Sequence, residues 1–288
     1  MKPLALPSAP GTDQRIADTV RLLQHAPFKP TDVVLDVGMG DGTISRSIAA
    51  RVSKVVGTGL DTLSYKIDPE ALKRERIEVV ECWVEKMPFP DATFDGAVMS
   101  HVLEHCLNVG LALQEVRRVL KPGGLLCVAV PPSDPLVCGG HVAVGWNIGQ
   151  LMYVLTMAGF SAATGHFAKK GYNVCAFVRK EERPLPPLRH DFGDLRALEA
   201  DGRFPLPIRN ADPNLEAFWG DLDAVNWPWV ETLDQERIGP NARLLRKLIP
   251  ASLRPKLGQM FLRLAVALGA SKTRPPGRTY VNPDRLQA

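Results

Sequence analysis

Several features that would place a protein in a special class are missing from this sequence. No uninterrupted run of 18 apolar residues occurs, so nothing in it predicts a membrane-spanning helix. The net charge at pH 7 is only +4, which is too small to indicate nucleic-acid binding. Pro3, Pro7 and Pro10 interrupt the segment where a secretory signal needs an apolar stretch. We therefore expect a cytoplasmic protein.

The cysteines form no recognisable framework. Their number is odd and no C-x-x-C pair occurs, so neither a set of structural disulfides nor a cysteine-rich metal site is indicated. Each lies in or beside an apolar segment, which predicts small buried thiols in a reducing compartment. The five are Cys82, Cys106, Cys127, Cys138 and Cys175.

The most informative segment is residues 33–52. An apolar run from Val33 to Val37 is followed by glycines at three alternate positions and then by apolar residues at helical spacing. This order predicts a buried strand, a tight turn and a helix. The glycine spacing departs from the dinucleotide pattern G-x-G-x-x-G, because Thr43 stands where the third glycine belongs. No Gly-Lys-Ser/Thr follows, so a P-loop for nucleoside triphosphates is excluded.

Strands and helices alternate up to about residue 180, which predicts an α/β fold with a mostly parallel sheet covered on both faces. The last two strands, joined by Lys169-Lys170-Gly171, look like a hairpin. The expected strands are 33–37, 54–58, 77–81, 94–100, 125–130, 161–167 and 173–179. The first expected helix is capped at Thr12 or Asp13, carries Ile16, Val20 and Leu23 on one face and is ended by Pro27 and Pro30. The other expected helices span 43–52, 69–74, 109–120 and 147–158.

A family resemblance rests on the glycine turn and on residues 94–124, FDGAVMSHVLEHCLNVGLALQEVRRVLKPGG. A strand-end acid before G-x-G-x-G, then Phe-Asp, Leu-Glu-His and Leu-Lys-Pro-Gly-Gly, resembles the class I methyltransferases that use S-adenosylmethionine (SAM). The resemblance covers about residues 31–180. It implies a Rossmann-like, seven-stranded, mostly parallel sheet and SAM as cofactor, while the acceptor stays open because function lies in sites carried by the fold.

The resemblance also implies which residues surround SAM. Asp36 and the turn residues Gly38, Met39, Gly40 and Gly42 would hold its methionine end. The adenosine would lie against Gly59, Asp61, Trp83, Val84 and Glu85, with Ser100 at the edge of the cofactor site.

Two of these positions depart from the family pattern. Gly59 stands where an acid usually holds the ribose hydroxyls, so either Asp61 reaches back or backbone and water hold the ribose. Trp83 stands where an aspartate usually accepts from the adenine amine. Its indole either stacks on the adenine or is an ordinary core aromatic.

Three histidines are candidates for the acceptor side. His101 and His105 follow the strand 94–100, and His141 lies in a loop beyond the strand 125–130. His141 is the first choice for a general base, since imidazole titrates near neutral pH. The run from His101 to His105 also spells H-x-x-E-H, a metalloprotease signature, but no third ligand is evident and we assign no metal.

Charge divides the remainder of the chain. Residues 181–238 carry a net charge of −7 and residues 239–288 a net charge of +9. We expect an N-terminal helical segment (1–30), a SAM-binding domain (31–180), an acidic extension (181–238) and a basic tail (239–288). The tail includes an amphipathic stripe around Leu257 and Phe261, which suits either peripheral contact with the inner membrane surface or packing on protein.

The function indicated is SAM-dependent methyl transfer to a small-molecule or glycan acceptor, at oxygen, without nucleic acid and with the oligomeric state open. One alternative is an inactive scaffold or regulatory partner with this fold, which the departures at Gly59 and Trp83 motivate. Another is an NAD-dependent oxidoreductase, which the glycine spacing disfavours.

Overall fold

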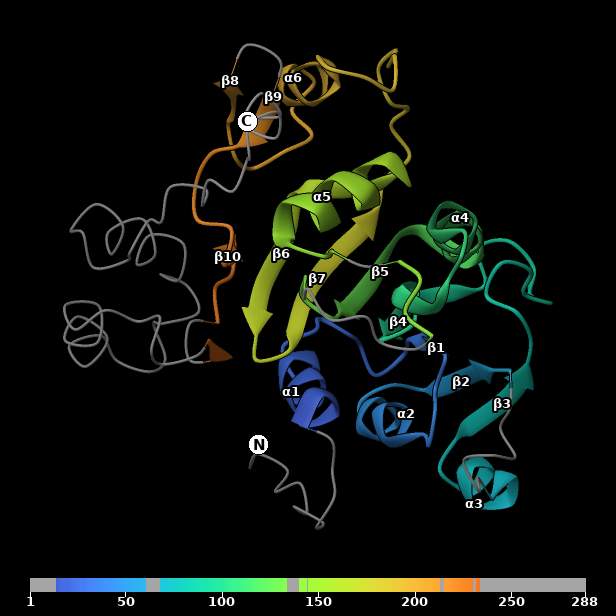
Figure 1. Cartoon of the computed structure of the whole chain (residues 1–288). Helices are drawn as coiled ribbons and strands as arrows, with labels where there is room; N and C mark the ends of the chain where they lie inside the picture. The colour runs from blue at the N-terminus through green and yellow to red at the C-terminus, as the bar shows by residue number, and fades with distance from the viewer. Residues whose placement is uncertain are drawn as a thin grey trace.

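A computed structural model shows how these elements assemble (Figure 1). It describes residues 14–60, 68–133, 140–143, 145–212, 215–229 and 232–233. Thr12, Asp13, Asp61, Cys138 and the whole basic tail lie outside the described residues, so the expectations placed on them stay predictions.

A single large sheet forms the centre of the described part of the chain. Its first five strands in chain order are all parallel, and their neighbours follow the order β3-β2-β1-β4-β5. These strands read as nearly unbroken apolar runs because helices cover both of their faces. Their bounds are Val33–Val37 (β1), Lys54–Gly59 (β2), Ile77–Glu81 (β3), Phe94–Ser100 (β4) and Leu120–Val130 (β5).

A hairpin completes the sheet beyond β5. Strands β6 (Phe160–Lys170) and β7 (Asn173–Lys180) are antiparallel to each other, and β7 pairs antiparallel with β5. The short strand β10 (Ala224–Val225) pairs with the outer edge of β6. The seven-stranded, mostly parallel fold is therefore confirmed, and the sheet gains an eighth strand that the sequence did not reveal.

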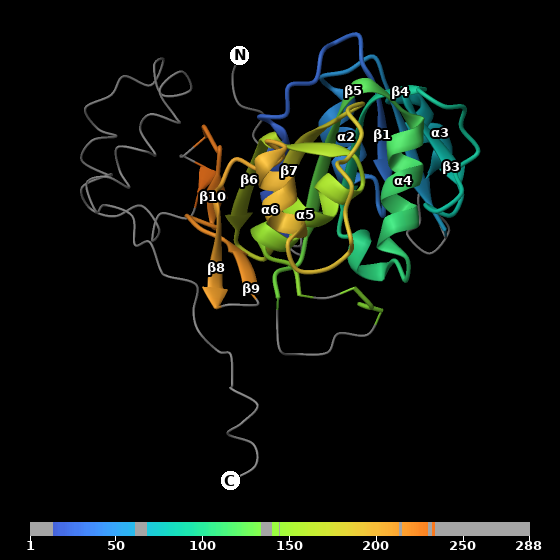
Figure 2. The same ribbon diagram turned by 90° about the horizontal axis from the view of Figure 1, so that it is seen from above.

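Two hydrophobic cores lie on the two faces of this sheet (Figure 2). Helices α1 (Gln14–Leu23), α2 (Thr43–Ala49) and α3 (Pro69–Arg74) lie on one face. Helices α4 (Val109–Val119) and α5 (Ile148–Met157) cover the other. Each expected helix among the described residues is present, with ends that differ by a few residues at most.

The start of β5 differs from expectation. The sequence predicts that this strand spans residues 125–130, after Lys121-Pro122-Gly123-Gly124, yet the strand begins at Leu120, opposite Phe94. The pairing then shifts, so that Gly96 faces Leu125. The proline and glycines fit within this irregularity because the residues there do not maintain a regular ladder.

The acidic extension folds back onto the domain. It contains α6 (Asp194–Ala200) and the two-stranded sheet of β8 (Ile208–Asp212) and β9 (Leu215–Phe218), which adds apolar side chains to the α4–α5 core. Trp227 is fully buried, and its indole N–H donates to Thr232 at 2.8 Å. The Trp-Pro-Trp segment at residues 227–229 therefore contributes to packing.

Among the described helices, none has the length and apolar character that spanning a membrane requires.

Candidate active site

The carboxyl ends of β1, β2 and β4 meet at one edge of the sheet. Val37 pairs with Thr58 on one side and with Met99 on the other, so the residues after these three strands lie together. The strand order changes direction at β1, and open α/β sheets bind ligands where this happens.

The glycine turn lies at this edge because its backbone needs glycine. Gly38, Gly40 and Gly42 all have positive φ, at 67°, 53° and 78°. A Cβ on Gly38 would lie 2.6 Å from a methyl carbon of Val102, so the turn passes directly beneath the segment after β4. Glycine therefore permits both the backbone conformation and the close approach.

A cavity of about 390 Å³ opens above the turn. This volume falls within the usual range for small-molecule sites. Segments from four strand ends line it: the glycine turn, the end of β2, the segment after β3 and the segment after β4. Predicted site residues among its lining are Gly38, Met39, Gly40, Gly59, Trp83, Val84, Glu85, His101 and His105.

Other predicted site residues lie elsewhere. Gly42 caps α2 behind the turn, and Ser100 points to α1, where its hydroxyl lies 3.5 Å from that of Thr19. Asp36 is buried beneath the cavity and accepts a hydrogen bond of 2.6 Å from the Ser45 hydroxyl. Burial raises the pKa of Asp36 to about 7, with the Ser45 hydrogen bond opposing that rise.

Met39 and Trp83 show how side chains shape the walls. Met39 turns inward and packs so tightly that a Cβ on Gly57 would collide with its sulfur. Trp83 is 66% exposed at the cavity rim, so its interpretation as a core aromatic is wrong. A Cβ on Gly59 would meet no atom of the described residues within 4 Å.

On the acceptor side, both ring nitrogens of His101 take part in a chain of hydrogen bonds. Its Nδ1 lies 2.9 Å from Glu104 Oε1, and its Nε2 lies 2.7 Å from Asn173 Oδ1. The Asn173 amide is oriented by its own N–H group, which donates to the Arg15 carbonyl at 3.0 Å. Both ring nitrogens of His101 therefore face protein oxygens, and neither is free to take a proton from an acceptor.

His105 and His141 lie beside one another on the same side. Their ring centroids are 5.0 Å apart, and the planes are nearly perpendicular at 82°. His141 reaches this place because Val142 and Ala143 donate backbone hydrogen bonds of 2.7 and 3.1 Å to the Glu104 carbonyl. The sequence pointed to all three histidines but not to the roles of Glu104 and Asn173, which hold His101 from positions 3 and 72 residues away.

Comparison with known proteins agrees with this architecture. Residues 35–128 match the family model described as a methyltransferase domain. An uncharacterised methyltransferase of Schizosaccharomyces pombe is 36% identical over 110 residues, which cover 34% of this chain and 40% of that protein. A ubiquinone/menaquinone biosynthesis C-methyltransferase of Hydrogenovibrio crunogenus is 34% identical over 130 residues, covering 42% of this chain and 51% of that protein.

Among solved structures, a SAM-dependent methyltransferase from Aquifex aeolicus aligns with a TM-score of 0.49 and 23% identity, covering 57% of this chain and 89% of that one. The match of residues 35–128 to the methyltransferase-domain model agrees with the resemblance seen in the sequence. The chain spans about half or less of the length of the two curated relatives named above.

Proposed function

We propose that the protein is a SAM-dependent methyltransferase that acts on an oxygen of a small-molecule or glycan acceptor. The observation that carries this proposal is the cavity in which the glycine turn, the end of β2 and the Trp83–Glu85 segment meet. The bare backbone of Gly38 and Gly40 suits the methionine end of SAM, and the exposed indole of Trp83 suits a flat adenine.

The reaction is an in-line displacement. The acceptor oxygen forms a bond to the methyl carbon while the bond from that carbon to sulfur breaks, and S-adenosylhomocysteine leaves as a neutral thioether. The protein contributes alignment, which is worth up to about 7–11 kcal/mol in favourable cases. A hydroxyl acceptor must also lose its proton, and removal by a positioned group adds about 10²–10⁴-fold to the rate.

Methylation at oxygen is supported by the imidazoles of His105 and His141, since a hydroxyl acceptor needs help with its proton. The Hydrogenovibrio relative is named a C-methyltransferase. The two outcomes are separated by incubating cell extract with protein and SAM labelled with carbon-13 at the methyl group. The product's carbon-13 chemical shift distinguishes a methyl bound to oxygen from one bound to carbon, and a carbon-bound methyl would overturn the oxygen assignment.

Cofactor binding is tested by calorimetry with SAM and with S-adenosylhomocysteine. We expect wild-type protein to bind both, and Gly40→Val to lose binding because its side chain enters the cavity. Gly202→Val is the matched control, since Gly202 has a similar positive φ of 71° but lies in the acidic extension with open space around it.

Other results of this experiment would indicate a different function. Failure of wild type to bind either ligand would refute the proposal, and saturable binding of NAD instead would favour an oxidoreductase. Binding of SAM without transfer of label to any component of the extract would favour an inactive scaffold.

We also propose that the basic tail (239–288) makes a peripheral contact with an anionic membrane from the cytoplasmic side. Its net charge of +9 supports this. Flotation of anionic liposomes with wild type and with a chain ending at Pro240 tests it. Equal flotation of the two would remove the proposal.

A further inference from the structure

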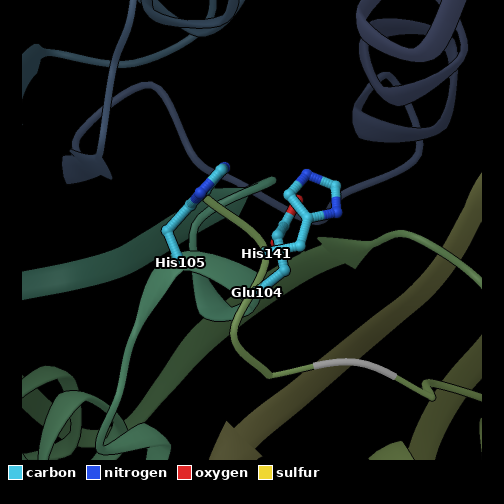
Figure 3. Close-up of side chains that lie close together, drawn as sticks. All are labelled: Glu104, His105 and His141. Atoms are coloured by element: carbon cyan, nitrogen blue, oxygen red, sulfur yellow. The ribbon is translucent and has the colours of Figure 1, made fainter. Parts of the chain in front are cut away.

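Three metal-binding side chains converge next to the cavity. Glu104 and His105 belong to the short helix η1 (Leu103–His105), and His141 comes from the loop that precedes α5. Figure 3 shows both imidazole rings extending to the same side, with the Glu104 carboxylate next to His141. One ligand atom from each residue lies within 4.8 Å of the other two.

Glu104 supplies the strongest sign that the cluster needs a cation. The residue is fully buried, and one carboxylate oxygen, Oε1, is hydrogen-bonded to His101. The other, Oε2, has no hydrogen-bond partner among the residues that the structure describes. Leaving a buried carboxylate oxygen unpaired is costly, and buried charges are normally paired or bound to a metal.

His105 is already oriented as a ligand. Its Nδ1 lies 2.8 Å from the Gly140 carbonyl oxygen, and a carbonyl can only accept, so Nδ1 carries the proton. The lone pair is then on Nε2. Histidines that bind metals usually donate their other ring N–H to a carbonyl or carboxylate in this way.

The dimensions suit one ion. Three atoms no more than 4.8 Å apart fit within a circle whose radius is 4.8 Å divided by the square root of three, about 2.8 Å. Zinc bonds to histidine nitrogen and carboxylate oxygen are about 2.0–2.2 Å long. Each ligand atom therefore needs to move inward by less than about 1 Å, which side-chain rotation can supply at an exposed His105 and a half-buried His141.

We propose that Glu104, His105 and His141 bind one divalent transition-metal ion of the zinc type. Two imidazoles favour such an ion over Mg²⁺ or Ca²⁺, which prefer oxygen ligands. Three protein ligands with a fourth position open are typical of catalytic rather than structural zinc sites. The sequence pattern H-x-x-E-H pointed to His101 and His105 as a pair, whereas the structure engages His101 elsewhere and brings in His141.

The site has a role in the reaction, and this part rests on the proposed function. His105 lines the cavity, so the open coordination position lies at its acceptor side. An acceptor hydroxyl bound there releases its proton to water more readily, because the metal stabilises the resulting oxyanion. The oxyanion then takes the methyl group from SAM. His105 and His141 act as ligands rather than as bases, and the acceptor class is an alcohol or phenol whose oxygen can coordinate a metal.

The test uses metal alone, on untagged full-length protein stripped with a chelator and dialysed. Calorimetry with Zn²⁺ and absorption spectroscopy with Co²⁺ are expected to show one strong site in wild type. His141→Ala and Glu104→Gln are expected to weaken binding by at least about a hundredfold, and His101→Asn by about 10–100-fold because it alters only a ligand's partner. His190→Asn, at an exposed histidine outside the cluster, is the control and is expected to bind as wild type does.

Circular dichroism establishes whether each variant is folded. If Glu104→Gln does not fold, His141→Ala still tests the metal site. Equal Zn²⁺ affinity in wild type and folded His141→Ala, or no strong site in wild type, would overturn the metal site. SAM binding is titrated separately in metal-free protein. A protein that binds Zn²⁺ but not SAM would refute the proposed function and leave the metal site standing, whereas one that binds SAM but not Zn²⁺ would do the reverse.

Discussion

The two sides of the cavity are built in different ways. On the donor side, the part proposed for the methionine end is one continuous stretch, in which β1, the glycine turn and α2 follow each other within residues 33–49. The part proposed for the adenosine adds the end of β2 and residues 83–85. The acceptor side is assembled from η1, the loop at residues 140–143 and the start of β7. A continuous motif specifies its own geometry through local backbone preferences, whereas a dispersed site depends on the whole sheet to bring its parts together.

Each side contains one buried carboxylate, and the partners differ. Asp36 on the donor side accepts from a neutral hydroxyl, so burial dominates and raises its pKa to about 7. On the acceptor side, one oxygen of Glu104 is hydrogen-bonded to His101, and the other has no partner within the described ranges of the chain. The donor side therefore suits a neutral buried acid, and the acceptor side is prepared for a positive charge.

The largest expected effect of pH comes from Asp36. Its folded pKa of about 7 lies above the ordinary value of 3.8, so the folded state holds a proton that the unfolded state has lost between these two pH values. Stability should therefore fall as pH rises through this window and level off above it. We expect wild type to lose up to about 3 kcal/mol more than Asp36→Asn between pH 5 and pH 8. Urea unfolding of both proteins measures this, and parallel curves would contradict it.

Asn173→Leu should destabilise the protein by disrupting the hydrogen bonds of the acceptor side. The change removes the partner of His101 Nε2 and one of the hydrogen bonds that the Arg15 carbonyl accepts, at a fully buried position and at a cost of about 2–4 kcal/mol. Asn108→Ala, which removes only the side-chain cap of α4, should cost about 1 kcal/mol. Chemical denaturation compares them. A loss for Asn173→Leu no greater than that for the cap variant would show that the hydrogen-bond chain contributes little.

Gly59→Asp should increase the affinity of the donor side for SAM. A Cβ at Gly59 meets nothing within 4 Å, and the position lines the cavity at the end of β2. A carboxylate there can accept from the ribose hydroxyls, and a charged hydrogen bond of about 1.5 kcal/mol gives roughly tenfold tighter SAM binding. Gly202→Asp adds the same charge at a distant site and should leave the affinity unchanged. Unaltered or weaker binding in Gly59→Asp would place the ribose elsewhere.

The smallest effect is expected at the rim. Trp83→Ala removes an exposed indole from the cavity wall, and loss of stacking worth about 1 kcal/mol should weaken SAM binding by roughly fivefold. Trp219→Ala removes another exposed tryptophan, which contacts Arg209 in the acidic extension, and should have no effect. Titration calorimetry gives both affinities, and an equal response of the two variants would remove Trp83 from the adenine site.

Sequence patterns predicted the strand, the glycine turn and the helix of the donor side well because the information for these elements is local. The apolar run at residues 33–37, the positive-φ glycines and the cap at Asp68 each determine structure within a few residues. The strand β10 has only two residues, which is too short for any periodicity to indicate it. The contact between Glu104 and the loop of His141 depends on β5 and α5 lying where they do, and no spacing in the sequence encodes it.

We propose that SAM lies between the glycine turn and Trp83. A crystal structure of the complex with S-adenosylhomocysteine would test this placement. We expect electron density for the methionine end against the backbone of Gly38 and Gly40 and for the adenine beside Trp83. Density for the ligand at another part of the sheet edge, or a side chain of the protein filling the space above the turn, would contradict it.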